Sequence, residues 1–190
     1  EPDCRARHRA SAALAPDEEV AAEVEDAAER AHRRTAYATA AALYRQAADL
    51  TPAPEERAAR LGAAASLTLQ AGLLDDAGDL AVQAEKLTAE PAKLARLARV
   101  HAAVEYERGD PRAASRMMVD AAAEAAPDER AAMLRTGAVY GWTSGELPAV
   151  LRAAELLPGD PTVRGLALLA DGVHADGLPL LGRLVDEARG

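Results

Sequence analysis

Apolar residues recur at intervals of three and four along most of the chain, which is the pattern of an amphipathic helix. In residues 55–71 the recurrence includes Leu61 and Leu69, and it ends at Gly72. A second run with the same periodicity opens at Asp75. A glycine placed directly after the last periodic residue is a signal for the end of a helix. We therefore predict two helices joined by a short turn at Gly72.

The same helix pair recurs along the sequence at nearly constant spacing. The turns of the next two pairs lie at Gly109 and Gly145, so that the three turns are 37 and 36 residues apart. Counting back 37 residues from Gly72 reaches Thr35, and counting forward 32 residues from Gly145 reaches Gly177. The pattern predicts an all-α chain of about five antiparallel helix hairpins.

These hairpins are expected to form a single helical-repeat domain that covers residues 1–190. A capping helix is predicted at 1–15, followed by repeats at approximately 17–51, 54–89, 91–126, 128–158 and 161–190. Pro52, Pro91 and Pro127 stand between repeats, and we expect each to end a helix because proline excludes the preceding residue from helical geometry. Since the chain stops directly after a helical pattern, we also expect it to be a fragment of a larger protein.

Small side chains supply much of the apolar content. Hydrophobic residues make up 49% of the chain but aromatic residues only 3%, Phe is missing, and Ala fills roughly a quarter of all positions. Alanine favours helix and lets two helices approach closely. The expected helix crossings are at Ala28, Ala40, Ala47, Ala65, Ala77, Ala84, Ala102, Ala114 and Ala121.

This arrangement of hairpins, small crossing residues and closing prolines resembles the tetratricopeptide repeat (TPR), a helix-turn-helix unit of 34 residues. The period of 36 to 37 residues departs from that unit. We therefore expect a divergent TPR-like superhelical array.

The charge balance argues against a nucleic-acid-binding surface. The 31 acidic residues outnumber the 22 basic ones and give a net charge of -9, whereas binding to DNA requires clustered Lys and Arg. The densest basic stretch lies at the N-terminus, and we interpret it as a solvated helix face; it consists of Arg5, Arg7, His8 and Arg9. The single Cys4 cannot form an internal disulfide, and neither a signal peptide nor an 18-residue apolar run is present. A cytoplasmic protein without membrane association is expected.

No catalytic, metal or cofactor site is predicted. The histidines His8, His32, His101 and His174 lie far apart in the sequence, and we interpret them as helix-surface or core residues. The stretch Gly141 to Gly145 resembles a nucleophile elbow, but its serine stands one place too late and the context is helix-turn-helix. An enzyme is therefore the least favoured class.

Acidic pairs stand at the starts of several predicted helices, where negative charge complements the helix macrodipole. This capping role explains them without any chemistry, and the pairs are Glu18-Glu19, Glu55-Glu56 and Asp75-Asp76.

Binding is the expected use of such a fold, because the first helix of each hairpin lines the concave face of the array. The candidate contacts are polar or aromatic residues of these first helices, namely Arg60, Gln70, Arg99, His101, Glu107, Arg135, Tyr140 and Trp142. Core positions are favoured over contacts for Tyr140 and Trp142, because an aromatic buries more apolar area than its neighbours. TPR domains of co-chaperones clamp a C-terminal carboxylate with paired asparagines, and this chain has no Asn. A protein partner or a small-molecule inducer is the expected occupant, with self-association left open.

Two segments of the sequence show a more specific resemblance. Residues 15–65, "APDEEVAAEVEDAAERAHRRTAYATAAALYRQAADLTPAPEERAARLGAAA", resemble the helical region of large ATP-binding LuxR-type transcriptional regulators. Residues 151–190, which contain "VRGLALLADGVHADGLPLLGRLVDEA", are similar to the next repeats of the same region. This group includes the maltose-activator-like proteins.

The resemblance implies that the parent protein carries an ATPase module before this segment and a helix-turn-helix DNA-binding domain after it. The segment would sense an inducer or partner and transmit the signal between them, with ATP and DNA bound only by the missing modules. The alternative is a generic TPR interaction scaffold with no transcriptional role.

Overall fold

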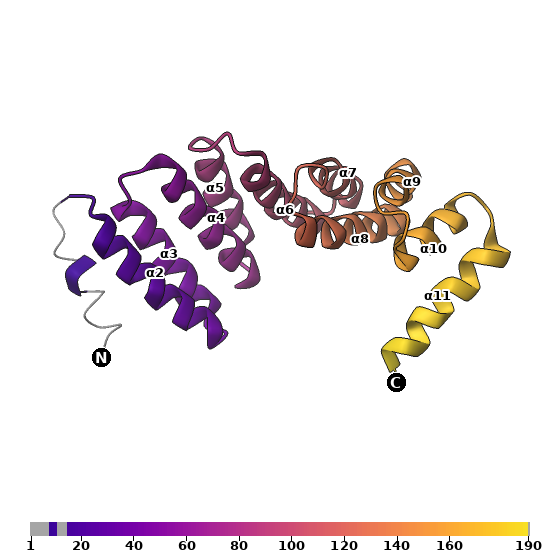
Figure 1. Cartoon of the computed structure of the whole chain (residues 1–190), viewed down its shortest axis with the longest axis horizontal. Coiled ribbons are helices and arrows are strands. Elements are labelled where there is room, and N and C mark those ends of the chain that lie inside the picture. Colours follow the sequence, from indigo (N-terminus) through magenta and orange to yellow (C-terminus); the bar gives the residue numbers. More distant parts are fainter. Residues whose placement is uncertain (1–7, 11–14, 190) are drawn as a thin grey trace. The chain divides into compact units, whose positions relative to one another are not determined.

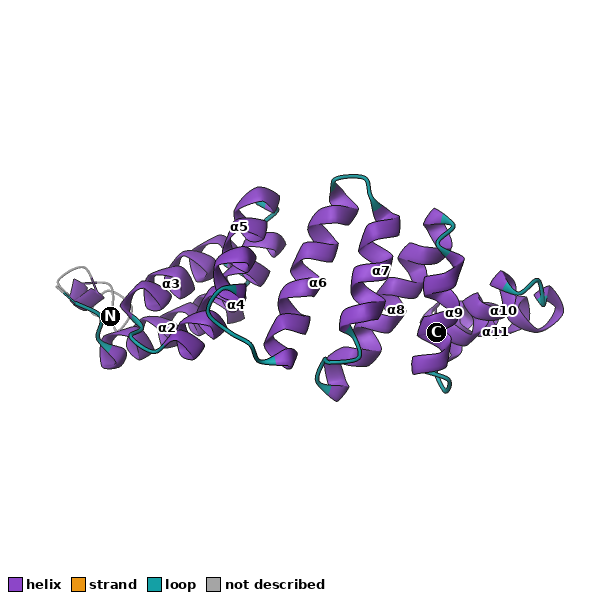
Figure 2. Cartoon of the chain, turned by 90° about the horizontal axis from the view of Figure 1, so that it is seen from above, coloured by secondary structure: helices purple, strands orange, loops and turns teal. Residues whose placement is uncertain are grey.

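The structure, a computed structural model, describes residues 8–10 and 15–189. Every regular element in these residues is a helix, and no strand occurs among them (Figure 1, Figure 2). The predicted all-α class is therefore confirmed. The capping helix expected at 1–15 falls mostly on residues that lie outside the described ones.

Ten helices follow one another along the described part of the chain, joined by short turns (Figure 1). They are α2 (Glu18–Arg33), α3 (Tyr37–Leu50), α4 (Pro54–Gln70), α5 (Leu74–Glu85), α6 (Pro91–Glu107), α7 (Pro111–Ala121), α8 (Pro127–Ser144), α9 (Leu147–Leu156), α10 (Pro161–Ala170) and α11 (His174–Arg189). Helices adjacent in sequence pack against each other from α2 to α5 and from α7 to α11, as expected for successive antiparallel hairpins.

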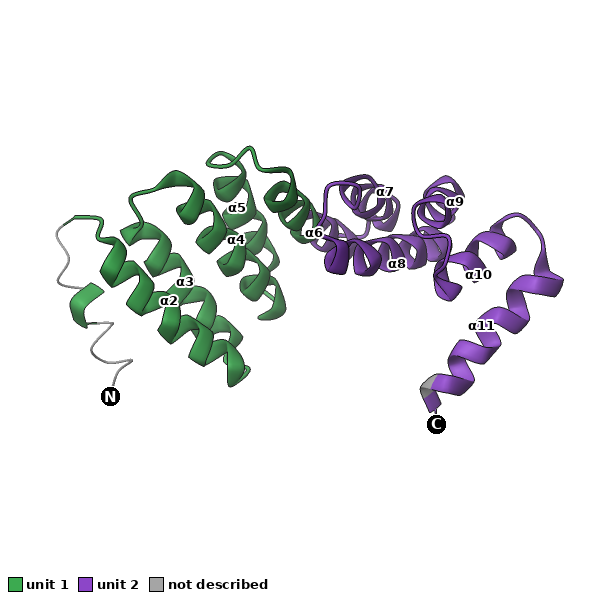
Figure 3. Cartoon of the chain, in the orientation of Figure 1, with its two compact units in different colours: residues 1–100 green, residues 101–190 purple. Residues whose placement is uncertain are grey.

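The chain divides into two compact units, coloured separately in Figure 3. Unit 1 covers residues 1–100 and contains α2 to α5 with the first part of α6. Unit 2 covers residues 101–190 and contains the end of α6 with α7 to α11. Each unit is described separately below.

The core of unit 1 is built largely from alanine. One cluster joins α2 and α3 around Val24 and Leu43, and a second joins α4 and α5 around Leu61 and Leu80. Leu97 and Val100 of α6 pack into the second cluster. Because most of these side chains end at Cβ, the helices approach closely and few atoms separate them.

The core of unit 2 relies on glycine as well as alanine. Gly137 and Gly141 are buried on α8, and an added Cβ at Gly137 would lie only 2.8 Å from Val119 Cγ2. Ser115 of α7 is fully buried and donates a hydrogen bond of 2.8 Å from Oγ to the Gly137 carbonyl. Helices α7 and α8 therefore meet almost backbone to backbone.

The predicted helix crossings lie in the core, with one exception. The alanines at positions 28, 40, 47, 65, 77, 84, 102 and 114 each have 0% exposure. Ala121 is only half-buried, and the buried residue is its neighbour Ala122. Helix α7 ends at Ala121, so the last position of the predicted pattern falls one residue away from the crossing.

Left-handed backbone marks the turns within the hairpins. Gly72, Gly109 and Gly145 have φ values of 80°, 94° and 77°, and Thr35 is the non-glycine residue with positive φ in the described chain, at 57°. The prediction of the fifth turn at Gly177 was wrong, because the left-handed residue there is Gly172, with φ of 78°. Gly177 lies inside α11, where Cβ would meet Leu169 at 2.9 Å, so close packing explains that glycine.

The prolines between repeats act differently from the prediction. Pro91 and Pro127 are the first residues of α6 and α8, whereas α5 and α7 have already ended at Glu85 and Ala121. The first helical position suits proline because its missing N–H would have no partner there and its fixed φ is already helical. The expectation that Pro91 and Pro127 end helices was therefore wrong, while Pro52 does follow the end of α3.

No helix in the described residues is both long enough and apolar enough to span a bilayer.

Candidate functional site

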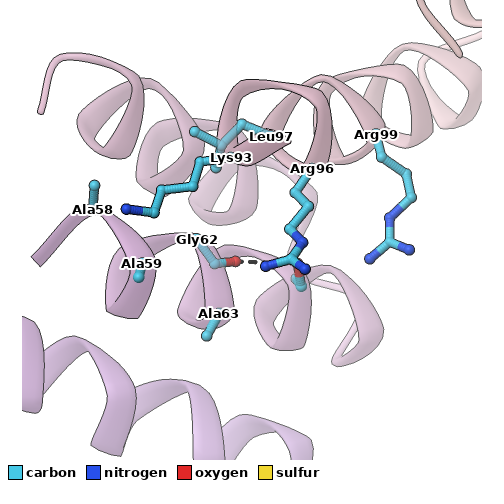
Figure 4. A pocket seen from close by; sticks show the side chains of 9 residues that line it. Ala58, Ala59, Gly62, Ala63, Lys93, Arg96, Leu97 and Arg99 are labelled. Carbon is cyan, nitrogen blue, oxygen red and sulfur yellow. Dashed lines mark hydrogen bonds between the residues drawn. The ribbon is translucent and has the colours of Figure 1, made fainter. Parts of the chain in front are cut away.

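A hollow of about 150 Å³ lies between the first helices of the second and third hairpins, α4 and α6, within unit 1 (Figure 4). On α4 it is lined by residues with small side chains, whose spacing of three and four places them on one helix face: Ala59, Gly62, Ala63 and Ser66. Leu97 of α6 and Ala58 of α4 also line it, and both are 3% exposed. These residues provide an apolar surface on which a side chain from another molecule could rest.

Three cations from α6 complete the lining, namely Lys93, Arg96 and Arg99. In Figure 4 Lys93 points toward Ala58, Arg96 turns toward Gly62, and Arg99 extends beside Arg96. No carboxylate lines the hollow. In a chain with a net charge of -9, three cationic side chains therefore line this apolar floor.

The positive charge at the Lys93 end is compensated by neighbouring carboxylates. Lys93 Nζ lies 2.9 Å from Glu55 Oε2 and 2.9 Å from Glu90 Oε2. The hydrogen bond to Glu90 and then that to Glu55 raise the pKa of Lys93, and the same contact with Lys93 lowers the pKa of Glu55. Thr88 Oγ1 also donates to Glu55 Oε2, at 2.7 Å.

The Arg99 end differs in this respect. Arg99 is half-buried against the hollow, and within the described residues the structure gives its guanidinium no ion pair or hydrogen bond. An arginine carries five N–H donors in a planar fork that matches a carboxylate. Arg99 therefore presents unused donors beside an apolar surface.

A second charged cluster in unit 1 is internal to the fold. Arg60 of α4 is only 7% exposed, and it donates from Nε to Glu25 Oε2 at 2.8 Å and from Nη2 to Glu18 Oε1 at 2.7 Å. Nη1 donates to Glu18 Oε2 at 3.0 Å and to Thr51 Oγ1. The guanidinium thus ties α4 to α2 and to the residue that follows α3.

The two clusters share one feature of the repeat. Glu18 and Glu55 lie in the first turns of α2 and α4, 37 residues apart, and each binds a cation from the first helix of the next hairpin. The predicted placement of acidic pairs at helix starts is confirmed for α2, α4 and α5. In α2 and α4, Glu18 and Glu55 also link successive hairpins, and this role goes beyond capping.

The candidate contacts predicted from sequence divide between the two units. Arg99 lines the hollow, Arg60 is held by the fold's own carboxylates, and Gln70 is exposed near the end of α4. The remaining five belong to unit 2, namely His101, Glu107, Arg135, Tyr140 and Trp142.

Arg135 in unit 2 also has a partner within the fold. Its Nε donates to Asp160 Oδ2 at 2.6 Å. Asp160 is the N-cap of α10, where Oδ1 accepts hydrogen bonds of 3.0 Å from the backbone N–H groups of Thr162 and Val163. Arg135 therefore neutralises a buried capping carboxylate.

The aromatic residues of unit 2 occupy different environments. Tyr140 stacks on Tyr106 with ring centroids 4.0 Å apart and an interplanar angle of 18°, and burial raises its pKa. Trp142 is 38% exposed, so its interpretation as a core residue was wrong. It lies on the solvent-facing side of α8 with Val139, three residues earlier, which is 42% exposed. The buried face of α8 is taken by Gly137 and Gly141 instead.

Sequence reasoning missed most of the lining of the hollow. It selected large polar residues, whereas the α4 side is made by Ala59, Gly62, Ala63 and Ser66. The spacing of these small residues can be seen in the sequence. So can the cations three residues apart on α6, which are Lys93, Arg96 and Arg99. A search for a small-residue face on one first helix beside a cationic face on the next would have found them.

Comparison of the chain with models of protein families, with curated proteins and with solved structures finds no match. Among the described residues, no group of three or more His, Cys, Asp or Glu side chains is placed to hold a metal ion.

Proposed function

We propose that this chain is a binding module that senses a ligand or partner through the hollow between α4 and α6. The observation that carries the proposal is the composition of that hollow, with three cations and no carboxylate around an apolar floor, in an acidic chain. Small side chains on α4 leave room for an occupant, while Leu97 supplies apolar contact. The arrangement offers an occupant apolar contact and hydrogen-bond donors.

We further propose that the module belongs to a LuxR-type transcriptional regulator. This rests on the resemblance of residues 15–65 and 151–190 to the helical region of those proteins. In such a parent the segment would couple occupancy of the hollow to ATP-dependent assembly. A ligand that binds one conformation of the repeats better than another would shift the parent toward that conformation.

A thermal-shift screen tests the binding role. The library should contain metabolites and peptides of varied charge, because a ligand that binds only the folded form raises its melting temperature. We expect at least one class to stabilise the wild-type chain and to lose this effect in the variant Ala59→Leu, which fills the hollow from an exposed position. The matched variant Ala42→Leu, exposed on α3, should keep the effect. Stabilisation that is equal in both variants would place binding elsewhere.

The regulator role has a separate test, which is the reading frame around this segment. We expect a nucleotide-binding ATPase module before it and a helix-turn-helix domain after it. The isolated chain should neither hydrolyse ATP nor shift a DNA fragment at physiological salt. A reading frame without both modules would refute the regulator and favour the generic scaffold, whereas the binding role would stand or fall with the thermal-shift result.

A further inference from the structure

We infer that the hollow between α4 and α6 receives an acidic amphipathic helix of a partner protein. The inference rests on the proposed binding function and names the class of its partner. It depends on three properties of the hollow: the shape of its α4 side, the apolar floor, and the uneven charge along its α6 side.

The shape favours a helix as the occupant. Ala59, Gly62 and Ala63 follow one face of α4 without a long side chain, and Ser66 extends the face by one turn, with its hydroxyl turned back to the Gly62 carbonyl at 3.1 Å. A face of small residues allows a second helix to approach closely. Side chains three and four residues apart on a partner helix would lie along this face of α4. Amphipathic helices bind in grooves in this way.

The floor favours an aliphatic contact. Leu97 is 3% exposed and belongs to the core cluster with Leu61, so its position is fixed by packing. An added Cβ at Gly62 would lie 3.4 Å from Leu97 Cδ2, in ordinary contact. The space of about 150 Å³ suits one or two aliphatic side chains rather than a large ring system or a nucleotide.

The charges on the α6 side of the hollow determine which charge the partner carries and how the partner is oriented. Lys93 is already paired with Glu55 and Glu90, so a partner gains little there. Arg99 has no partner within the described residues and lies about two helical turns further along α6. A carboxylate on the partner would therefore meet Arg99, where a charge-assisted bidentate contact can form next to an apolar surface. A basic partner would meet repulsion at the same place.

Fluorescence anisotropy tests this inference with the full chain. The probe is a labelled peptide of about 15 residues with Leu at helical spacing on one face and Glu beside it. Two matched peptides have the same length, one with Lys in place of Glu and one with the same residues in an order that destroys the apolar face. We expect the acidic amphipathic peptide to bind, and each matched peptide to bind at least about tenfold more weakly, with affinity falling as salt rises.

Variants of the chain locate the site. Arg99→Gln should weaken binding of the acidic peptide about tenfold, while Arg45→Gln, the same change on an exposed position of α3, should not. Ala59→Leu should abolish binding and Ala42→Leu should preserve it. Melting curves of all four variants establish that each is folded.

A different occupant would refute the inference, and each alternative predicts a different experimental result. Equal binding of the acidic and basic peptides, no binding of the acidic peptide, or equal binding by Arg99→Gln would each refute an acidic helix. So would inorganic phosphate that displaces the peptide at micromolar concentration, or a self-associated chain that Arg99→Gln makes monomeric. If the acidic peptide fails while thermal-shift ligands remain sensitive to Ala59→Leu, the binding module stands and only the acidic partner is refuted.

Discussion

Arg60 and Glu18, 42 residues apart in sequence, meet through two parallel hydrogen bonds, from Nη2 to Oε1 at 2.7 Å and from Nη1 to Oε2 at 3.0 Å. The Arg60 side chain is 8% exposed and the Glu18 side chain 50%, so the pair stands at the edge of the core. Glu25 accepts from the same guanidinium at 2.8 Å. One buried cation therefore fixes the second hairpin against the first.

Replacing this cation should destabilise unit 1. We expect Arg60→Met to lower the free energy of unfolding by about 2 kcal/mol, because it leaves two carboxylates near each other without their partner. Urea denaturation followed by circular dichroism measures the change. The control Arg57→Met removes an exposed contact with Asp49 at 3.9 Å and should cost less than about 0.5 kcal/mol. Equal losses in the two variants would show that Arg60 has no special structural role.

The same pair should make stability depend on acid pH. The hydrogen bond from Arg60 is the largest effect on Glu18 and lowers its pKa below the ordinary value of 4.5. A carboxyl whose pKa is lower in the folded chain stabilises it above the unfolded pKa, and this contribution is lost as pH falls through the folded pKa.

We therefore expect the stability difference between the wild type and Glu18→Gln to be constant near neutral pH and to shrink below the ordinary value of 4.5. Urea titrations of both proteins from neutral pH to about pH 3 measure this difference. If the stability difference between the wild type and Glu18→Gln grew on acidification, the lowered pKa of Glu18 in the folded chain would be contradicted.

Thr35 offers a stabilising substitution. Its φ of 57° is left-handed, and this conformation costs a β-branched residue about 1 kcal/mol or more. The Thr35 side chain is exposed, so its removal leaves no cavity. Thr35→Gly should raise the free energy of unfolding by roughly 0.5–1 kcal/mol, since the lost hydrogen bond to the Arg34 carbonyl is on the surface. Thr39→Gly, an exposed position within α3, should instead lower stability by about 0.5 kcal/mol. Thermal and urea unfolding of the two variants would show opposite signs.

Gly137 should tolerate no side chain. An added Cβ would lie 2.8 Å from Val119 Cγ2, 3.0 Å from Met118 Cβ and 3.3 Å from the Ser115 carbonyl oxygen. Gly137→Ala should therefore lower the free energy of unfolding by about 2 kcal/mol despite the better helix propensity of alanine.

The matched change Gly78→Ala on α5 meets nothing within 4 Å and should raise the free energy of unfolding by up to about 1 kcal/mol. The pair is compared by urea denaturation. Stabilisation by Gly137→Ala would mean that α7 and α8 can separate more easily than their packing indicates.

Much of the candidate site was not predicted because accessibility and pairing are properties of three-dimensional neighbours. Arg60 and Arg99 are both arginines on first helices and look alike in the sequence. The fold buries Arg60 among Glu18 and Glu25, and it leaves Arg99 beside the hollow with its donors unused. Trp142 was expected in the core, but buried glycines occupy the inner face of α8, and the tryptophan is on the outside.

The sequence by itself determined the helices, the turns at Thr35, Gly72, Gly109 and Gly145, and every predicted alanine position of the core except Ala121. These depend on local backbone preferences and on a period that repeats along the chain. The tertiary structure alone decided that the last turn falls at Gly172, since Gly177 is needed for close contact with Leu169. It also decided which cations are paired and where the hollow lies, because both depend on side chains that meet only when separate hairpins pack together.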